Sequence, residues 1–203
     1  MTEGERVHLG MRNKLVFWTI VVLTAAFTLV CEQVAAREPA GWDLLRQGGL
    51  VVLIRHAAAP GFGDPPNFRI GDCTTQRNLS EEGRLQAQAL GESFRRRKIP
   101  IEKVYSSQWC RCRDTAQLAF GAFQEHPALN SFFEQPQLKA PQTEALRAFL
   151  MQLRPQRGNL VLVTHQVNIT ALTGVVPQPG EMVVAALEDG GRPVVKSRIT
   201  APD

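Results

Sequence analysis

The chain has 203 residues, of which 44% are hydrophobic and 21% charged, and this composition excludes a wholly disordered, collagen-like or disulfide-knot protein. The 23 basic and 19 acidic side chains leave a net charge of +4, which suits an anionic small molecule. No zinc-finger, helix-turn-helix or RNA-binding motif is present, so nucleic acid is not an expected partner.

The N-terminal segment has the pattern of a secretory signal peptide. Residues 15–31 form an uncharged, mostly apolar run that follows two basic residues and precedes a small-residue cleavage site ending at Ala36. We therefore expect residues 1–36 to be removed and the protein to be exported, to the periplasm or out of the cell. The alternative is an uncleaved anchor in the inner membrane, because a run of this length lies at the lower limit for a spanning helix.

Beyond this segment, short apolar strands alternate with helices. The first strand is the apolar run 50–54, and the helix after it has Ser80 as N-cap and the basic cluster 95–98 at its C-terminal end. We interpret this cluster as a solvated helix terminus rather than a binding patch. The later elements are a less apolar strand at 103–106, helices at 108–120 and 142–153, an apolar strand at 160–163, and strands at 183–187 and 194–199.

This order of elements predicts an α/β fold. Apolar runs such as 50–54 and 160–163 are typical of strands that helices cover on both faces, and no internal repeat or low-complexity linker divides the chain. We therefore predict a single three-layer domain over residues 37–203, with a mostly parallel central sheet and helices on both faces.

Chemically active side chains follow three of the predicted strands. Arg55 and His56 come directly after the first strand, Arg111 lies in the first turn of a helix that follows another strand, and His165 comes after the late apolar strand. The carboxyl ends of strands in an open α/β sheet share one edge, so these side chains are expected to meet. Two arginines beside a helix N-terminus suit a dianionic phosphate, and a histidine among them can attack phosphorus.

Four motifs in a fixed order resemble the histidine phosphatase (phosphoglycerate mutase-like) superfamily over roughly residues 50 to 170. Any one of them is a weak signal, but four in register are specific. They are Leu53-Ile54-Arg55-His56-Ala57, then Asn78-Leu79-Ser80-Glu81-Glu82-Gly83 with Gln86-Ala87, then Val104-Tyr105-Ser106-Ser107 with Arg111 and Thr115-Ala116, and last Val163-Thr164-His165.

The resemblance implies a role for each site residue. His56 would be the nucleophile that becomes phosphohistidine, Arg55 and Arg111 would hold the phosphoryl group, and His165 would complete the pocket as a protonated imidazole. Arg77 matches a position at which related small phosphatases carry arginine, so we expect it to be a further phosphate contact. Neither a metal nor a cofactor is implied.

The sequence departs from the family pattern at the general acid. Mutase-type members carry a glutamate where this chain has Ser131, and Glu134 is the closest carboxylate, with Asp72 and Glu144 as further candidates. We take Glu134 as the candidate acid. Without an efficient acid, leaving groups that depart unprotonated, such as phosphohistidine, would be favoured. Ala57 replaces a glycine of the best-known members, which is a small change.

Three cysteines follow the signal segment, and export to an oxidising compartment leads us to expect one disulfide. Cys110 and Cys112 are two apart on one predicted helix, so their side chains diverge. Cys73 lies in a loop that must pass near the pocket if Arg77 is to reach phosphate. The resemblance gives Cys112 a small, inward position, so we favour the pairing of Cys73 with Cys110 over Cys112. Three reduced thiols are the alternative, and a zinc site is not expected.

The sequence therefore predicts a metal-independent phosphatase that hydrolyses a small phosphomonoester, such as an envelope phosphosugar, through phosphohistidine on His56. Some exported members of the resembled superfamily act on heptose phosphates of the lipopolysaccharide core. A phosphohistidine protein phosphatase and a non-enzymatic phosphate-binding member are the alternatives. Contact with a membrane is expected only through an uncleaved N-terminal segment, and the oligomeric state is left open.

Overall fold

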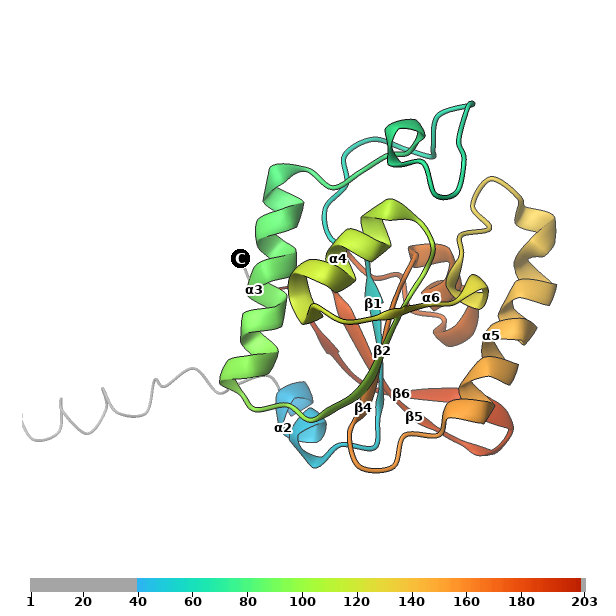
Figure 1. Ribbon diagram of the computed structural model, residues 1–203. Helices are drawn as coiled ribbons and strands as arrows, with labels where there is room; N and C mark the ends of the chain where they lie inside the picture. The colour runs from blue at the N-terminus through green and yellow to red at the C-terminus, as the bar shows by residue number, and fades with distance from the viewer. Residues whose placement is uncertain (1–39, 202–203) are drawn as a thin grey trace, which may run out of the picture. The chain divides into compact units, whose positions relative to one another are not determined.

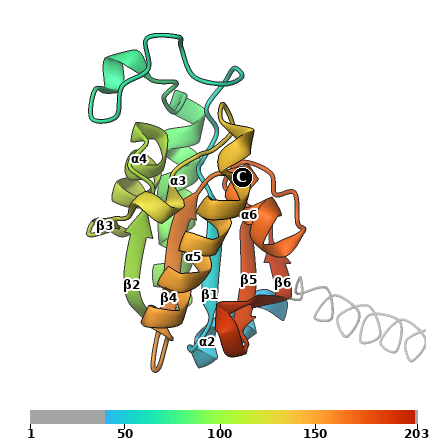
Figure 2. The same ribbon diagram turned by 90° about the vertical axis from the view of Figure 1, so that its right-hand side faces the viewer.

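A mostly parallel sheet forms the centre of the protein, as the computed structural model, which describes residues 40–201, shows. Within these residues the sheet has six strands in the order β3-β2-β4-β1-β5-β6, with β1 and β4 side by side in Figure 2. The pairs β1–β4, β2–β4 and β2–β3 are parallel, whereas β5 is antiparallel to β1 and β6. The strands are β1 Val51–Arg55, β2 Ile101–Ser106, β3 Gln124–Glu125, β4 Asn159–Thr164, β5 Met182–Leu187 and β6 Pro193–Ile199.

Helices cover both faces of this sheet, which confirms the predicted three-layer α/β fold (Figure 1). The helices α2 (Ala40–Gln47), α3 (Glu81–Arg96) and α4 (Cys110–Phe120) pack on one face, and α5 (Lys139–Leu153) and α6 (Gln166–Thr173) on the other. Short 3-10 turns lie at Cys73–Thr75, Pro127–Leu129, Pro136–Leu138 and Asp189–Gly191.

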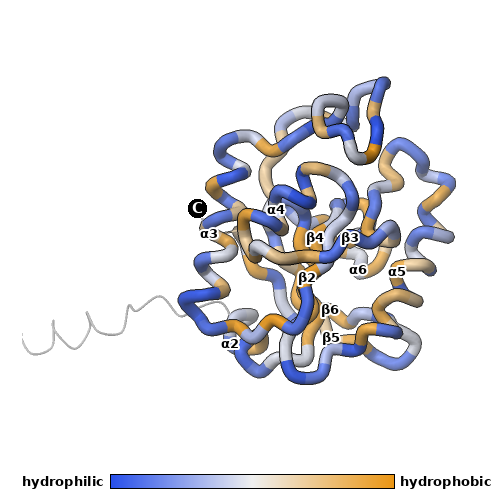
Figure 3. The backbone as a smooth tube through the Cα atoms, viewed as in Figure 1, coloured by the Kyte–Doolittle hydropathy of each residue, from blue (hydrophilic) through white to orange (hydrophobic). Residues whose placement is uncertain are grey.

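The side chains of β1 alternate between the two faces of the sheet, and both faces are buried. Val52 and Ile54 contribute to the core beneath α3 and α4, while Val51 and Leu53 contribute to the core beneath α5. Successive side chains of a strand point to opposite faces, so an unbroken apolar run supplies both cores at once. In Figure 3 the orange, apolar segments concentrate on the central strands, whereas the outer helices alternate between blue and orange.

The helix α3 begins and ends where its sequence signals predict. The hydroxyl of Ser80 accepts a hydrogen bond from the backbone N–H of Gly83 at 3.1 Å, and acidic residues occupy the first turn. In the basic cluster at its end, the Arg97 guanidinium lies 4.6 Å from the Trp42 ring centre and Arg95 donates to the Ala119 carbonyl. The basic cluster therefore lies at the C-terminal end of α3, where two of its side chains contact α2 and α4.

The elements that the sequence pattern did not indicate are α6, α2 and the short β3. Residues 166–173 of α6 are rich in β-branched side chains, which lowers intrinsic helix propensity, and the helix is stabilised by the burial of Ile169 and Leu172. The helix α5 begins at Lys139 rather than Gln142, with Pro141 in its first turn, where proline is tolerated.

Residues 40–201 all belong to one compact unit. None of the helices in this part of the chain is both long and apolar enough to span a membrane. The predicted signal peptide or anchor over residues 1–36 lies outside the described residues.

Candidate active site

Three strand ends meet at one edge of the sheet, where the sequence placed its candidate residues. Strands β1 and β4 are paired in register, so His56 and His165, which follow them, face each other with ring centres 5.5 Å apart. The backbone N–H of His56 donates to the Thr164 carbonyl at 3.0 Å. After β2, the N–H of Ser107 donates to the Val163 carbonyl at 2.9 Å, which brings the start of α4 to the same edge.

A cavity of about 100 Å³ lies at this edge, and we call it the phosphoryl pocket. Three guanidinium groups lie in its wall, and the Nε atoms of Arg55 and Arg111 are buried without a hydrogen-bond partner within the described residues. This concentration of positive charge suits a dianionic group. The lining residues are Arg55, His56, Gly61, Phe62, Gly63, Asp64, Arg77, Arg111, Ser131, Phe133, His165, Gln166 and Val167.

His56 has the tautomer and charge of a nucleophile. Its Nδ1 lies 2.8 Å from the Ala57 carbonyl oxygen, which can only accept, so Nδ1 carries the proton and Nε2 keeps a lone pair. Burial, with the Arg111 guanidinium next in size, lowers the pKa of His56 to about 3. The imidazole is therefore neutral at physiological pH. Thr115 fixes the neighbouring backbone by accepting from the Ala57 N–H at 3.0 Å and donating to the Arg111 carbonyl.

His165 is oriented by a chain of hydrogen bonds from Asn130 and Ser107. The N–H of Gln108 donates to Asn130 Oδ1 at 3.0 Å, so this atom is the amide oxygen and accepts from the Ser107 hydroxyl at 3.2 Å. The Ser107 oxygen, 2.9 Å from His165 Nε2, then accepts the Nε2 proton. Cys112, a buried free thiol, lies 3.5 Å from the same nitrogen.

The charge of His165 differs from the expectation of a protonated imidazole. Burial, followed by repulsion from Arg111, lowers the pKa of His165 well below its usual value. The pocket thus holds two neutral histidines, because the same arginines face both rings. A dianionic substrate would neutralise these cations and raise the pKa of His165 again.

Asp64 also lines the phosphoryl pocket, although the sequence pattern did not single it out. Its carboxylate forms a buried two-pronged pair with Arg111, at 2.7 and 3.1 Å, and also accepts from Trp109 Nε1 at 2.9 Å. Burial opposes ionisation of Asp64, but the hydrogen bonds and charge of Arg111 outweigh it and lower the pKa. The sequence signal was only a lone acid in a loop rich in glycine and proline.

Arg77 lines the pocket, as the resemblance implied, and also forms hydrogen bonds that stabilise the loop before α3. Its Nε donates to the Gly63 carbonyl at 2.8 Å, its Nη1 donates to the Ala59 carbonyl, and its backbone N–H donates to Asp64. Two of its side-chain donor atoms are thus engaged by the loop that carries Asp64.

The candidate acid Glu134 lies beside the phosphoryl pocket rather than in its wall. It lines a larger adjoining cavity, and its carboxylate comes close to Gly63, which lines the phosphoryl pocket. Asp72 caps the turn at Cys73–Thr75 and pairs with Arg69, and Glu144 is an exposed residue of α5; neither lines either cavity. The side chain of Ser131 lies where the two cavities meet.

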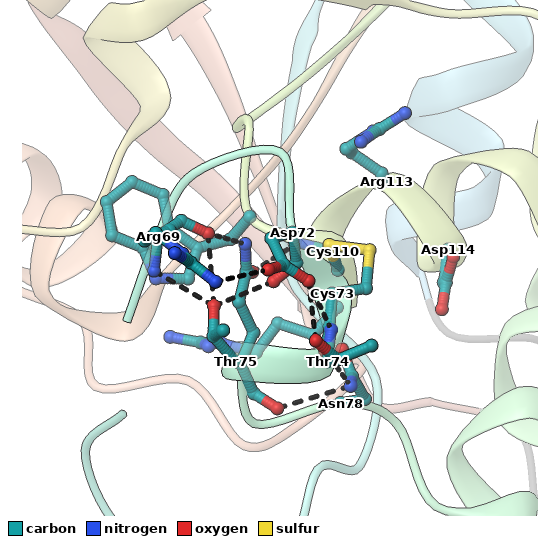
Figure 4. Close-up of a disulfide and its surroundings, with 12 residues drawn as sticks. Arg69, Asp72, Cys73, Thr74, Thr75, Asn78, Cys110, Arg113 and Asp114 are labelled. Carbon is teal, nitrogen blue, oxygen red and sulfur yellow. Dashed lines mark hydrogen bonds and ion pairs between the residues drawn. A yellow bond between two sulfur atoms is a disulfide. The ribbon is translucent and has the colours of Figure 1, made fainter. Parts of the chain in front are cut away.

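A disulfide joins Cys73 to Cys110, with Cα atoms 5.7 Å apart, which confirms the favoured pairing (Figure 4). Cys110 is the first residue of α4 and is followed by Arg111, so the bond fastens the loop before α3 to the end of α4 that lines the pocket. Gln76 strengthens this junction by accepting from the Cys110 N–H at 2.9 Å. Among residues 40–201, no group of three or more His, Cys, Asp or Glu is arranged to hold a metal ion.

Comparison with known proteins agrees with this geometry. A family model described as Histidine phosphatase superfamily (branch 1) matches residues 51–134, which include Arg55, His56, Arg77 and Arg111. Residues 51–134 therefore resemble this superfamily, and the match ends before β4 and His165. No curated protein matches the chain.

Solved structures of low sequence identity share the fold. Rv3214 from Mycobacterium tuberculosis is 15% identical, with a TM-score of 0.54 over 75% of this chain and 97% of that one. A phosphoserine phosphatase mutant from Entamoeba histolytica, in complex with phosphoserine, is 15% identical with a TM-score of 0.50, covering 73% and 95%. The protein histidine phosphatase SixA, complexed with tungstate, is 13% identical with a TM-score of 0.50, covering 74% and 96%.

Proposed function

We propose that the protein is a phosphatase that hydrolyses a phosphomonoester through a phosphohistidine on His56. The observation that carries this proposal is a neutral imidazole, with a free Nε2 lone pair, in a small pocket that it shares with three guanidinium groups. Phosphoryl transfer to a side chain requires a nucleophile and positively charged groups that bind the phosphoryl oxygens.

The reaction proceeds in two displacements. Nε2 of His56 attacks phosphorus, the ester P–O bond breaks, and the leaving oxygen takes up a proton to depart as the alcohol. Water then attacks the phosphohistidine, its P–N bond breaks, and orthophosphate leaves with the imidazole neutral again. Arg55, Arg77 and Arg111 stabilise the negative charge on the equatorial oxygens in both steps. This scheme requires no metal ion.

Proton donation to the leaving group is assigned to Glu134. Asp64 is unsuited to this role because its pKa is lowered and Arg111 engages both its oxygens. Glu134 lies beside Gly63, which lines the phosphoryl pocket, and it also lines the adjoining larger cavity.

A phosphohistidine protein phosphatase is the second candidate. Asp64, the only carboxylate among the described residues that line the phosphoryl pocket, is held ionised by Arg111 and has no proton to donate, and phosphohistidine leaves without needing a strong acid. The fold is shared with the protein histidine phosphatase SixA. A non-enzymatic phosphate-binding role is the remaining alternative, and it predicts binding of phosphate without turnover.

The same proposal places the protein outside the cytoplasm. It is supported by the uncharged run at residues 15–31 and by the Cys73–Cys110 disulfide, since such bonds persist in oxidising compartments. An envelope phosphosugar is then an accessible substrate.

The test is phosphate release from p-nitrophenyl phosphate, glycerol 3-phosphate and phosphohistidine, with trapping of the intermediate. We expect turnover to be lost in His56→Asn and retained in the control His126→Asn, whose ring stacks on Phe149 outside the pocket. Acid-labile, base-stable phosphate should appear on the wild-type chain only. Turnover by His56→Asn, or phosphate binding without any turnover, would refute the mechanism. Release from phosphohistidine alone would select the second candidate.

A further inference from the structure

Glu181 is a buried carboxylate that lies outside the wall of the phosphoryl pocket. Only 3% of its side chain is exposed, yet both of its oxygens have partners. Its Oε1 accepts from Arg198 Nε at 2.6 Å, and its Oε2 accepts from the backbone N–H of Gln178 at 2.7 Å. Burial opposes ionisation of Glu181, but these donors outweigh it and lower the pKa, so the group is charged. A charge is costly to bury, and the proposed mechanism does not use this one.

The Glu181 side chain closes the loop between α6 and β5. Pro177 and Pro179 have no backbone N–H, so Gln178 has the only backbone donor among these three residues. The carboxylate of Glu181 accepts this donor, and the N–H of Glu181 donates to the Gln178 carbonyl at 3.0 Å. The shape of this loop therefore depends on the carboxylate.

The same loop contacts Arg55 through both its guanidinium and its backbone. Nη1 of Arg55 donates to the Pro177 carbonyl at 3.0 Å. The N–H of Arg55 donates to the Glu181 carbonyl at 3.2 Å. The N–H of Gly180 is shared between the carbonyls of Arg55 and His56, at 3.1 and 3.2 Å. With Nη1 engaged, the Nε of Arg55, which is buried without a partner within the described residues, remains available to an anion.

The backbone of Arg55 is held independently of the Glu181 side chain. Strand β1 is paired with β5 on one side and with β4 on the other, as far as Arg55 opposite Thr164. The Pro177 carbonyl, in contrast, belongs to the loop, next to the residue whose N–H the Glu181 carboxylate binds. Loss of the carboxylate should therefore release the guanidinium of Arg55 while the strand stays in place.

From these contacts we infer that Glu181 is a positioning residue for the guanidinium of Arg55. The inference rests on the proposed phosphatase function, in which Arg55 binds the phosphoryl group, and it adds a residue outside the pocket wall. The carboxylate fixes the turn at Gln178, the turn fixes the Pro177 carbonyl, and this carbonyl holds the guanidinium in place. Displacement of a binding group by about 1 Å can lower a rate about a hundredfold.

A double-variant cycle tests whether Glu181 acts through Arg55. We expect Glu181→Gln, which removes the charge but keeps the shape, to lower kcat/KM for p-nitrophenyl phosphate about tenfold. Arg55→Met should lower it about a hundredfold or more. The loss in Arg55→Met/Glu181→Gln should match that in Arg55→Met within about twofold, because no guanidinium is left to position. Losses that simply multiply would overturn the inference.

Glu188→Gln is the matched control for removal of a charge. Glu188 pairs with Arg192 at the other end of the β5–β6 hairpin, outside the wall of the phosphoryl pocket, so this substitution should leave kcat/KM unchanged. A loss equal to that in Glu181→Gln would overturn the inference.

Substitution of Arg198, whose side chain is half exposed, tests the same contacts without changing a buried group. Arg198→Met removes one of the two donors to the Glu181 carboxylate and should lower kcat/KM several-fold. Arg198→Lys should restore most of it, because an ammonium group can donate to the same oxygen. Equal losses in Arg198→Met and Arg198→Lys would contradict the positioning role.

Binding of orthophosphate, measured by calorimetry, separates this inference from the proposed function. Phosphate release by wild type with an unchanged kcat/KM in Glu181→Gln would refute only the positioning role. No release from any ester would refute the phosphatase, and the cycle would then be measured as the Kd for orthophosphate. Glu181→Gln should weaken this binding when Arg55 is present and not in Arg55→Met. The same weakening in both backgrounds would overturn the inference.

Discussion

At the scale of single residues, Arg111, which we propose to bind phosphate, also forms a buried ion pair with Asp64. Both side chains are almost fully buried, at 8% and 4% exposure, and the two-pronged geometry satisfies both. Loss of one partner would leave the other charge buried and unpaired, which typically costs 3–5 kcal/mol, while replacing both by neutral groups costs far less.

Substitution at Arg111 should therefore affect both stability and activity. We expect Arg111→Met to lower the free energy of unfolding by about 4 kcal/mol and kcat/KM by about a hundredfold or more. The double variant Asp64→Asn/Arg111→Met should regain most of the stability but not the activity. Urea unfolding and phosphate-release kinetics measure the two effects. A stable Arg111→Met, or an equally unstable double variant, would contradict the interpretation of the pair.

The neutral histidines make stability depend on pH. The pKa of His56 is about 3 in the folded protein and ordinarily 6.5, so the unfolded chain binds a proton that the folded chain does not. Above pH 6.5 the histidine is neutral in both states, and His56 does not make the free energy of unfolding depend on pH. As the pH falls from 6.5 towards 3, His56 lowers the free energy of unfolding by about 1.4 kcal/mol per pH unit. Urea unfolding between pH 5.5 and 4.5 should show a slope that is steeper by this amount in wild type than in His56→Asn, since His165 contributes in both. Parallel slopes would mean that His56 is not buried neutral.

At the scale of elements, the loop before α3 depends on the helix α4. Asp64 and Arg77 lie on this loop, and Cys73 ties it to the first residue of α4, next to Arg111. Gly83 allows α3 to approach the chain after His56 closely, since a Cβ there would lie 2.0 Å from the Ala58 carbonyl oxygen. The phosphoryl pocket therefore forms where the loop before α3, the start of α4 and the chain after His56 are held close together.

Removal of the disulfide should loosen this junction. Cys73→Ser/Cys110→Ser opens a loop with a sequence separation of 37, and closure of such a loop contributes up to about 4 kcal/mol. We expect a lower melting temperature and a several-fold loss in kcat/KM, both reproduced in wild type by a reductant. Addition of the reductant to the double variant is the control, because that variant has no disulfide left to reduce. Identical melting of the double variant and wild type would rule out a stabilising role.

The strand and helix predictions were accurate where local pattern and tertiary packing agree. Ser80, the acidic first turn and the basic last turn of α3 are all local signals, and the helix follows them. The helix α6 was missed because its β-branched sequence carries no local helix signal, and only the packing of Ile169 and Leu172 stabilises it.

At the scale of the whole molecule, the signal peptide predicted over residues 1–36 would direct the protein out of the cytoplasm. Secretion of the full chain should yield a product that begins at Arg37, as intact mass and N-terminal sequencing would show. Ala36→Arg should block cleavage, because a small residue is required there, whereas Ala35→Arg should not, because the residue between the two recognition positions is free. A full-length product from the wild-type chain would favour the membrane anchor.

The sequence by itself determined the α/β order of elements and the placement of Arg55, His56, Arg111 and His165 at strand ends and at the start of a helix. These features depend on local hydrophobic periodicity and on the rule that parallel strands share a carboxyl edge. Only the tertiary structure decided that Asp64, 47 residues from Arg111, pairs with it, that both histidines are neutral, and that a second cavity adjoins the pocket. The reason is that ion pairing, burial and cavity shape depend on side chains distant in sequence, whose contacts are set only when the two layers of helices pack against the sheet.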